Sequence, residues 1–221
     1  RQDQDEFALQ SHQRACAAAD AGLFRKEIVP VSIDGDSGST VIDGDQGPRA
    51  DSSMESLAGL KTVFRADGSV TAGNASMISD GAAAVVIASE AAAKKAGRSP
   101  LARVVCATTA GEKPDDLFIA PVAAVRQVLQ KAGLTLNDVD LFEINEAFAS
   151  QMLACLRQLE LSEERVNIHG GAIALGHPIG ASGARVLVTL LHALEARDGK
   201  VGVASLCLGG GNAVAILVER L

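Results

Sequence analysis

Apolar residues in the first part of the chain recur at the spacing of helices and strands. Residues 5–22 and 52–64 place apolar side chains about one helical turn apart, and the first of these stretches stops at Gly22. Residues 27–33 predict a short strand, whereas residues 34–48 are rich in Asp, Gly and Ser and predict a solvated loop. We therefore expect two helices separated by one strand and a loop.

A long apolar run follows a turn of small residues at 71–76. Residues 82–89 carry no charged side chain and predict a buried strand, and residues 90–96 predict a helix that ends at Gly97. The sequence Arg-Ser-Pro at 98–100 interrupts both patterns. We place the main domain boundary there.

Beyond residue 100, strand and helix patterns alternate regularly. The expected order is βαβαβαββ, with strands at 101–109, 139–144, 166–169, 201–207 and 212–219, and helices at 121–132, 146–159 and 182–197. This alternation predicts an α/β fold in which helices cover a mainly parallel sheet of five strands. Only three glycines join the last two strands, so this pair must be antiparallel.

Composition and charge exclude several classes of function. The 221 residues carry a formal net charge of −7 and neither Trp nor Tyr, which argues against a nucleic-acid partner. Apolar stretches fall short of the ~20 residues of a membrane span, and the chain opens without a signal peptide. The four cysteines lack CxxC spacing, which favours a reducing compartment, and no zinc-ligand spacing occurs. We expect a cytoplasmic protein that binds a small molecule, with no metal and no membrane partner.

The densest group of unusual residues surrounds His177. Five glycines between residues 170 and 183 predict a tightly bent loop that presents this side chain, and Ser182 or Gly180 is expected to cap the following helix. Asn145 and Cys207 also lie where predicted strands end, at the sheet edge where α/β proteins bind ligands, so we expect them to converge with His177.

Each of these three residues also has a purely structural interpretation. Asn145 has the position of a helix N-cap, Cys207 that of an inert core cysteine, and His177 that of a buried histidine satisfied by hydrogen bonds. Cys207 gains interest from the three glycines that follow it, because their backbone N–H groups could stabilise an oxyanion.

Three segments around these residues resemble signature motifs of the thiolase family. They are Asn-Glu-Ala-Phe at 145–148, the glycine-rich stretch at 170–185 and Cys-Leu-Gly-Gly-Gly at 207–211. They follow the family's order and spacing, and upstream segments are thiolase-like too, so the resemblance runs from end to end. The nearest subgroup is the acetyl-CoA acetyltransferase type. The resemblance implies a thiolase-like fold, coenzyme A and acetyl-CoA as substrates rather than bound cofactors, and a homo-oligomer of two or four subunits.

The resemblance also implies a role for individual residues. His177 matches the histidine that activates the nucleophilic cysteine and faces a thioester oxygen, and Cys207 matches the acid/base cysteine. Asn145 matches the residue that holds a water in one oxyanion hole, and Gly209 the backbone donor of the other. The positions that bind CoA and substrate in the family correspond to Arg49, Ser56, Phe64, Ser76 and Phe148.

The chain departs from the family in one major respect, because nothing in it resembles the motif of the nucleophilic cysteine. We therefore expect the C-terminal portion of a longer enzyme whose nucleophile lies outside this chain. Its parts would be the remainder of a CoA-binding loop domain at 1–77, the last strand and helix of an otherwise missing N-terminal half-domain at 78–98, and the C-terminal domain at 99–221. A strand without its partners would expose its edge and its apolar face.

The activity expected of the whole enzyme is the reversible condensation of two acetyl-CoA to acetoacetyl-CoA, or thiolysis of a 3-ketoacyl-CoA. This chain alone is expected to be inactive. The alternatives are a longer-chain 3-ketoacyl-CoA thiolase and a non-catalytic CoA-binding or structural subunit. A ketoacyl synthase is disfavoured, because Cys207 stands where such enzymes carry a second histidine.

Overall fold

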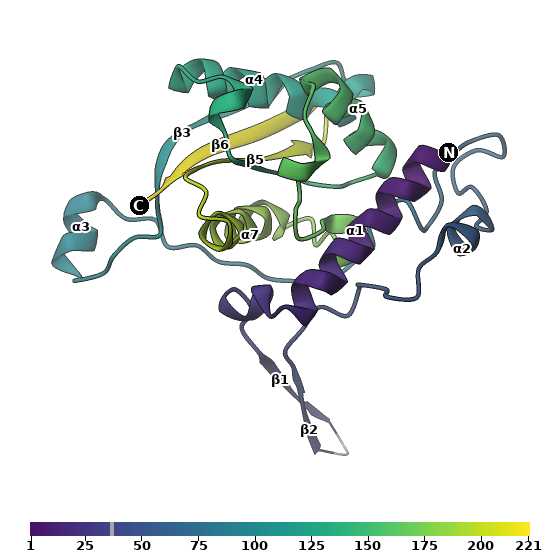
Figure 1. The fold of residues 1–221 in the computed structure, drawn as a ribbon, viewed down its shortest axis with the longest axis horizontal. Coiled ribbons are helices and arrows are strands. Elements are labelled where there is room, and N and C mark those ends of the chain that lie inside the picture. Colours follow the sequence, from purple (N-terminus) through teal and green to yellow (C-terminus); the bar gives the residue numbers. More distant parts are fainter. Residues whose placement is uncertain (36–37) are drawn as a thin grey trace.

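The computed structural model describes residues 1–35 and 38–221 of the chain. A four-stranded sheet with the strand order β3-β6-β5-β4 lies at its centre, and helices lie on both faces (Figure 1). The strands are β3 (Ala102–Gly111), β4 (Leu141–Ile144), β5 (Val201–Leu208) and β6 (Asn212–Arg220). The helices α4 (Ala120–Ala132) and α5 (Ala149–Leu159) lie on one side, and α7 (Ser182–Ala196) lies on the other.

The sheet differs from the predicted one in its size and its pairing. β4 and β5 are parallel, but β6 lies between β3 and β5 and is antiparallel to both. Three strands thus run the same way, while two of the three pairings are antiparallel. The prediction of a mainly parallel five-stranded sheet is therefore wrong, whereas the predicted antiparallel pair at the end of the chain, β5 and β6, is confirmed.

The predicted strand at 166–169 is reduced to one isolated bridge between Val166 and Phe142. Asn167 has a positive φ of 47°, which is incompatible with an extended strand. Its side chain instead takes over the pairing: Asn167 Oδ1 accepts from Ile144 N at 2.9 Å, and Asn167 Nδ2 donates to Ile144 O at 2.8 Å. A side-chain amide here replaces a fifth strand at the edge of β4.

Alternating side chains divide the core between the two faces of the sheet. Val203 and Leu217 pack below α4 and α5, whereas Ala204 and Val218 face α7, where they meet Leu190. Four 3₁₀ turns complete the connections, namely η1 (Leu23–Lys26), η2 (Pro114–Ile119), η3 (Leu136–Asp138) and η4 (Glu163–Arg165). Within the described ranges, no helix is both long and apolar enough to cross a membrane.

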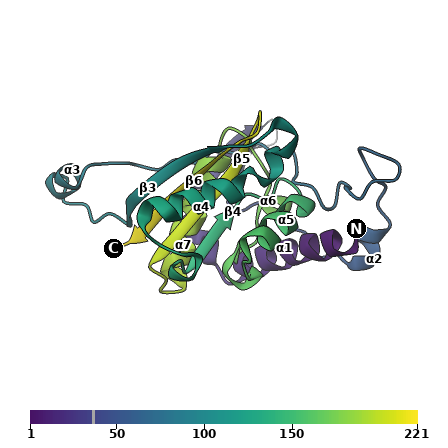
Figure 2. The same cartoon turned by 90° about the horizontal axis from the view of Figure 1, so that it is seen from above.

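The N-terminal helix is confirmed, and the short strand predicted at 27–33 is found slightly later, at 31–35. The loop predicted at 34–48 is wrong in part, because it contains a second strand. α1 (Gln2–Asp20) lies beside α5 and the short α6 (Ala172–Leu175) (Figure 2). Residues 31–35 and 38–42 pair as the exposed antiparallel strands β1 (Val31–Gly35) and β2 (Gly38–Ile42), and the predicted loop residues 36–37 lie outside the described part. The Asp, Gly and Ser residues that predicted a loop flank β-branched residues, which pair as strands.

The helix predicted at 52–64 is shorter in the structure. α2 (Met54–Ala58) begins at Ser53, whose side chain forms a capping box with Ser56. The helix ends at Gly59, and Thr62 then pairs with Thr71 in an isolated bridge. This bridge turns the chain back on itself, which prevents the helix from continuing.

The segment from 78 to 98 contributes no strand to the central sheet (Figure 1). The helix predicted in it is confirmed as α3 (Glu90–Lys95), and Ser89 caps its N-terminus. The buried strand predicted at 82–89 is absent, and Val86 is 97% exposed. An apolar run becomes a strand only where a neighbouring strand satisfies its backbone groups.

Candidate active site

His177 is held between two side chains, one on each side of its ring. Asn145 Nδ2 lies 3.3 Å from His177 Nε2, and Ser182 Oγ lies 2.6 Å from Nδ1. Ser182 Oγ donates its own proton to the Pro178 carbonyl at 3.0 Å, so it must accept from Nδ1–H. The ring is therefore held in the tautomer whose Nε2 is free of a proton and faces Asn145.

The environment of His177 favours its neutral form. The side chain is half-buried, and this burial, together with the positive charge of Arg185, lowers the pKa of His177 from its ordinary value. An unprotonated Nε2 at neutral pH is the state that a general base requires.

Glycine is required at two positions of the loop because of close approach. A Cβ on Gly176, which has a φ of +94°, would lie 2.3 Å from Ser79 Oγ, and one on Gly171 would lie 2.3 Å from the Glu146 carboxyl carbon. The expected capping of α7 by Ser182 or Gly180 is wrong, since the N-cap is Ala181 and has no side-chain hydrogen bond. The hydroxyl of Ser182 is used for His177 instead.

Asn145 lies at the end of β4 and does not cap a helix. The N-cap of α5 is Phe148, so the structural interpretation of Asn145 does not hold. Asn145 N donates to Ser205 O at 3.0 Å, which aligns Asn145 with β5 two residues before Cys207. Asn145 Oδ1 is buried and has no hydrogen-bond partner among the described residues. The amide thus has one acceptor that is not used within this part of the chain.

Glu146 is a fully buried carboxyl that the sequence analysis missed. It accepts hydrogen bonds from Ser11 Oγ at 2.7 Å, Asn167 Nδ2 at 2.9 Å and Ile173 N at 3.1 Å. Burial raises its pKa, while these hydrogen bonds oppose the rise. Glu146 connects the end of β4 to α1 and to the segment that leads into the His177 loop. A charged residue directly after a predicted buried strand was the available signal.

Cys207 lies near the end of β5, and the glycine turn follows. Burial raises the pKa of the Cys207 thiol, so the group is a protonated thiol at neutral pH. Gly209 has open space around its Cβ position, whereas a Cβ on Gly211 would lie 2.4 Å from Glu112 O. No hydrogen bond joins Cys207 to Asn145 or His177 within the described residues. The structure brings Asn145 and His177 into contact and places Cys207 on the neighbouring strand.

Two family models match the chain along almost its whole length. "Thiolase, N-terminal domain" matches residues 1–91, and "Thiolase, C-terminal domain" matches residues 98–220. The chain belongs to the thiolase family. Acetyl-CoA acetyltransferases of Escherichia coli (strain K12) and Pseudomonas aeruginosa are 52% and 53% identical to it, over 100% of this chain and 56% of each relative. The chain therefore spans about half the length of the curated relatives it matches.

Solved thiolase structures have the same fold. The crystal structure of the Bacillus anthracis acetyl-CoA acetyltransferase gives a TM-score of 0.98 at 49% identity, and covers 100% of this chain and 56% of that chain. The crystal structure of human mitochondrial 3-ketoacyl-CoA thiolase in complex with CoA has a TM-score of 0.92 and 43% sequence identity to this chain. The match covers 100% of this chain and 55% of that chain. The expected family and the thiolase-like α/β fold are confirmed.

One of the residues expected to contact CoA or substrate, Ser76, adjoins the His177 loop of this thiolase. Ser76 N donates to Ala147 O at 3.1 Å, and the next residue along, Met77, accepts from His177 N at 3.1 Å. The ring of Phe148 meets that of Phe64 edge-on, with 6.0 Å between the ring centroids. A short stretch around Ser76 therefore links the segment after Asn145 to the His177 loop.

The other two expected CoA contacts lie in the loop region before α2 and in α2 itself. Arg49 N donates to His12 Nδ1 at 3.2 Å, and the Arg49 charge contributes to a lowered pKa of His12, after burial. Ser56 Oγ is engaged in the α2 cap, where it donates to Ser53 O at 2.8 Å. Within the described residues, neither Arg49 nor Ser56 forms a hydrogen bond with the Asn145–His177–Ser182 group.

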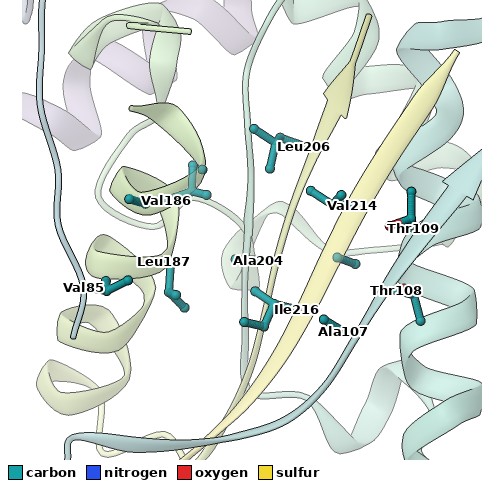
Figure 3. A pocket seen from close by; sticks show the side chains of 13 residues that line it. Val85, Ala107, Thr108, Thr109, Val186, Leu187, Ala204, Leu206, Val214 and Ile216 are labelled. Carbon is teal, nitrogen blue, oxygen red and sulfur yellow. The ribbon is translucent and has the colours of Figure 1, made fainter. Parts of the chain in front are cut away.

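An apolar pocket of about 470 Å³ opens on the α7 face of the sheet, away from these polar groups (Figure 3). Val85, Leu187 and Ile216 are among its lining residues, and none of the expected site residues lines it. The described residues also contain no group of three or more His, Cys, Asp or Glu side chains that could hold a metal ion. Asn145 and Cys207, by contrast, lie at the edge where β4 and β5 end.

Proposed function

We propose that this chain supplies the acid/base half of the active site of an acyl-CoA acyltransferase of the acetyl-CoA acetyltransferase type. The observation that carries the proposal is the Asn145–His177–Ser182 arrangement, in which a neutral imidazole has a defined tautomer with an unprotonated Nε2. The identity of 52% to an acetyl-CoA acetyltransferase supports the choice of reaction.

In the cleavage direction, His177 Nε2 accepts the proton of a nucleophilic cysteine thiol, and the resulting thiolate attacks the 3-keto carbon of acetoacetyl-CoA. The bond between carbons 2 and 3 breaks, which leaves an acetyl thioester on the nucleophile. The departing acetyl-CoA enolate takes a proton from the Cys207 thiol. A raised pKa keeps Cys207 in the thiol form that this step needs.

In the second half of the reaction, the Cys207 thiolate takes the proton of the CoA thiol. The CoA thiolate then attacks the acetyl thioester and releases a second acetyl-CoA, and the departing cysteine thiolate takes its proton back from His177. Asn145 and His177 stabilise one thioester oxygen, Asn145 through a water that it holds, and the Gly209 N–H stabilises the other. The unused Oδ1 acceptor of Asn145 is consistent with a bound water.

The nucleophile in this proposal is a cysteine outside these 221 residues. Burial raises the pKa of Cys155 to about 11, and it raises the pKa of Cys16 as well, which is the opposite of an activated thiolate. Cys106 lies on β3 and donates to Val128 O at 3.5 Å. We therefore propose that the 221-residue chain alone is inactive.

The proposal also covers the ligand, the compartment and the oligomeric state of the enzyme. Coenzyme A would contact Arg49, Ser56, Phe64, Ser76 and Phe148, and no further cofactor takes part. A human thiolase similar to this chain is known in complex with CoA, which supports CoA as the ligand. We also propose a cytoplasmic homo-oligomer of two or four subunits.

The test uses the full natural polypeptide that carries these residues and measures CoA-dependent cleavage of acetoacetyl-CoA. Replacing His177 with Ala should lower kcat/KM at least ~100-fold, because both proton transfer and oxyanion stabilisation are lost. His192 on α7 provides the matched control, since it faces Glu195 and is remote from Asn145. His192→Gln should keep the wild-type rate, and an unchanged rate in His177→Ala would refute the proposal.

A longer or more polar acyl chain is a second candidate substrate, because a beta-ketoadipyl-CoA thiolase of Pseudomonas aeruginosa is 51% identical to this chain. The catalytic groups would be the same, and only the acyl pocket would differ. Comparing kcat/KM for acetoacetyl-CoA with that for a longer 3-ketoacyl-CoA separates the two candidates. CoA binding by calorimetry without any turnover would instead indicate a non-catalytic thiolase-like subunit.

A further inference from the structure

A buried contact between an arginine and a carboxyl spans the same two elements as the Asn145–His177–Ser182 group. Arg185 Nη1, in the first turn of α7, lies 3.6 Å from Glu143 Oε2 in β4, and the Glu143 side chain is only 2% exposed. Glu143 precedes Asn145 by two residues, and Arg185 follows Ser182 by three. Two parallel connections therefore join the end of β4 to the start of α7, one through His177 and one through the contact between Arg185 and Glu143.

The position of Arg185 is not explained by the stability of α7. The N-terminus of a helix carries a partial positive charge, so a cation in the first turn is unfavourable. Arg185 must be stabilised by groups outside its own helix.

Those groups are four buried or partly buried carboxyls from separate parts of the chain. Burial raises the pKa of each of them, and the charge of Arg185 opposes the rise in each. They are Glu27 with a pKa of about 7, Asp45, Glu143 with a pKa of about 8, and Glu146. Arg14 of α1 also acts on Glu143. The charge of Arg185 thus acts on carboxyls in segments that follow η1, β2 and β4.

The contact between Arg185 and Glu143 is not a hydrogen bond. Among the described residues, the three guanidinium nitrogens of Arg185 and both carboxyl oxygens of Glu143 are buried without a hydrogen-bond partner. An arrangement of this kind contributes little to stability and is retained where it specifies the position of the elements it joins.

We propose that Arg185 is a positioning residue for His177, which together with Glu143 fixes the first turn of α7, and with it Ser182 and the His177 ring, against the end of β4. The inference rests on the proposed function, because His177 is the proton acceptor in that function. Arg185 also has an electrostatic effect on the same ring. A nearby cation disfavours the imidazolium, so Arg185 keeps a larger fraction of His177 neutral.

The two partners should therefore affect His177 differently. Arg185→Met removes the cation and should raise the pKa of His177. Arg185→Lys keeps a positive charge, so the pKa of His177 should lie between the values in Arg185→Met and in the wild type. Glu143→Gln removes only a carboxyl that can oppose the cation, so it should leave the pKa unchanged or lower it.

The experiment measures the rate at which diethyl pyrocarbonate modifies His177 as a function of pH, followed by mass spectrometry of the His177 peptide in the full natural polypeptide. This reagent reacts with the neutral imidazole, so the midpoint of the rate curve reports the pKa. The midpoint should move to higher pH in Arg185→Met and should not do so in Glu143→Gln. In parallel, kcat should fall about 10- to 100-fold in Arg185→Met with the KM for CoA unchanged, because the ring is displaced.

A folded Arg185→Met variant with the wild-type midpoint and wild-type kcat would overturn the inference. If this variant does not fold, Glu143→Gln and Arg185→Lys decide: a lower kcat at constant KM in Glu143→Gln supports the inference, and wild-type values in both variants overturn it. The modification of His177 requires no turnover. A polypeptide without thiolysis whose midpoint still depends on Arg185 would therefore contradict the proposed function alone.

Discussion

Two apolar runs of similar length differ in this chain, because one forms a buried strand and the other forms no strand and is exposed. Residues 201–207 form most of β5, a strand between β4 and β6, and Val203 within it is fully buried. Residues 82–89 form no strand, and Val86 is 97% exposed. An apolar pattern therefore predicts which residues can be buried, but the available partners decide whether they are.

The exposed run lies beside another apolar surface without a partner. Val85 lines the pocket between α7 and the sheet, opposite Leu206 and Ile216 (Figure 3). The chain spans about half the length of its relatives, and we expect a longer polypeptide to cover both surfaces. The comparison between the two runs can be tested directly.

The largest difference in stability between the two runs should appear when a charged residue is placed in each. In the 221-residue chain, Val203→Asp should lower the free energy of unfolding by more than about 4 kcal/mol, because it buries an unpaired carboxyl. Val86→Asp in the same chain should change it by less than about 0.5 kcal/mol. Urea unfolding followed by circular dichroism measures both.

The same pair of variants in the full natural polypeptide sharpens the test. If residues 82–89 pair with other strands there, Val86→Asp should become destabilising as well. A large effect of Val86→Asp in the 221-residue chain would contradict the exposure of this run.

A smaller effect is expected in the pH dependence of stability. Burial raises the pKa of Glu143 to about 8 from 4.5, so the folded state keeps a proton that the unfolded state loses, and the free energy of unfolding falls as the pH rises across this window. Glu143→Gln should reduce this fall in urea titrations at several pH values. Glu27, with a pKa of about 7, acts in the same direction, so part of the slope should remain.

Glu90 in α3 is the matched control, because its side chain is 83% exposed and pairs only with exposed Lys94. Glu90→Gln should leave the pH dependence of the free energy of unfolding as it is in the wild type, because exposed ion pairs contribute little to stability. If the free energy of unfolding depended on pH equally in the wild type and in Glu143→Gln, Glu143 would not be the carboxyl that stays protonated in the folded state.

The smallest effect concerns the cap of α3. Ser89→Ala removes the hydrogen bond to Ala92 N, which should weaken this helix by about 1 kcal/mol. Because α3 packs on no part of the sheet, global unfolding in urea should not change, while hydrogen exchange of the α3 amides should become faster. A lowered global stability would instead mean that α3 contributes to the core.

The sequence predicted the features that depend on local patterns. α1, α4 and α7 were found from helical spacing and glycine stops, and the His177 loop from its glycines. The sheet order was not predictable, because the place of β6 between β3 and β5 depends on contacts between distant residues. The strand β2 was missed because Asp, Gly and Ser are typical of both solvated loops and hairpin turns.

The supporting groups of the site were missed for a related reason. Ser182 was assigned to a helix cap, whereas its hydroxyl binds His177. Glu143, Glu146 and Arg185 were not singled out, because a charged residue in a sequence does not reveal which distant group is buried beside it. Only the fold brings these four side chains to the junction of β4 and α7.

The central claim is that these residues form the acid/base part of an acyltransferase site and that its nucleophile lies elsewhere. The most direct test incubates the full natural polypeptide with acetoacetyl-CoA, quenches it in acid and locates the acetyl group by peptide mass spectrometry. The account predicts an acetyl thioester on a cysteine outside these 221 residues. An acetyl group on Cys16, Cys106, Cys155 or Cys207, in place of such a cysteine, would contradict it.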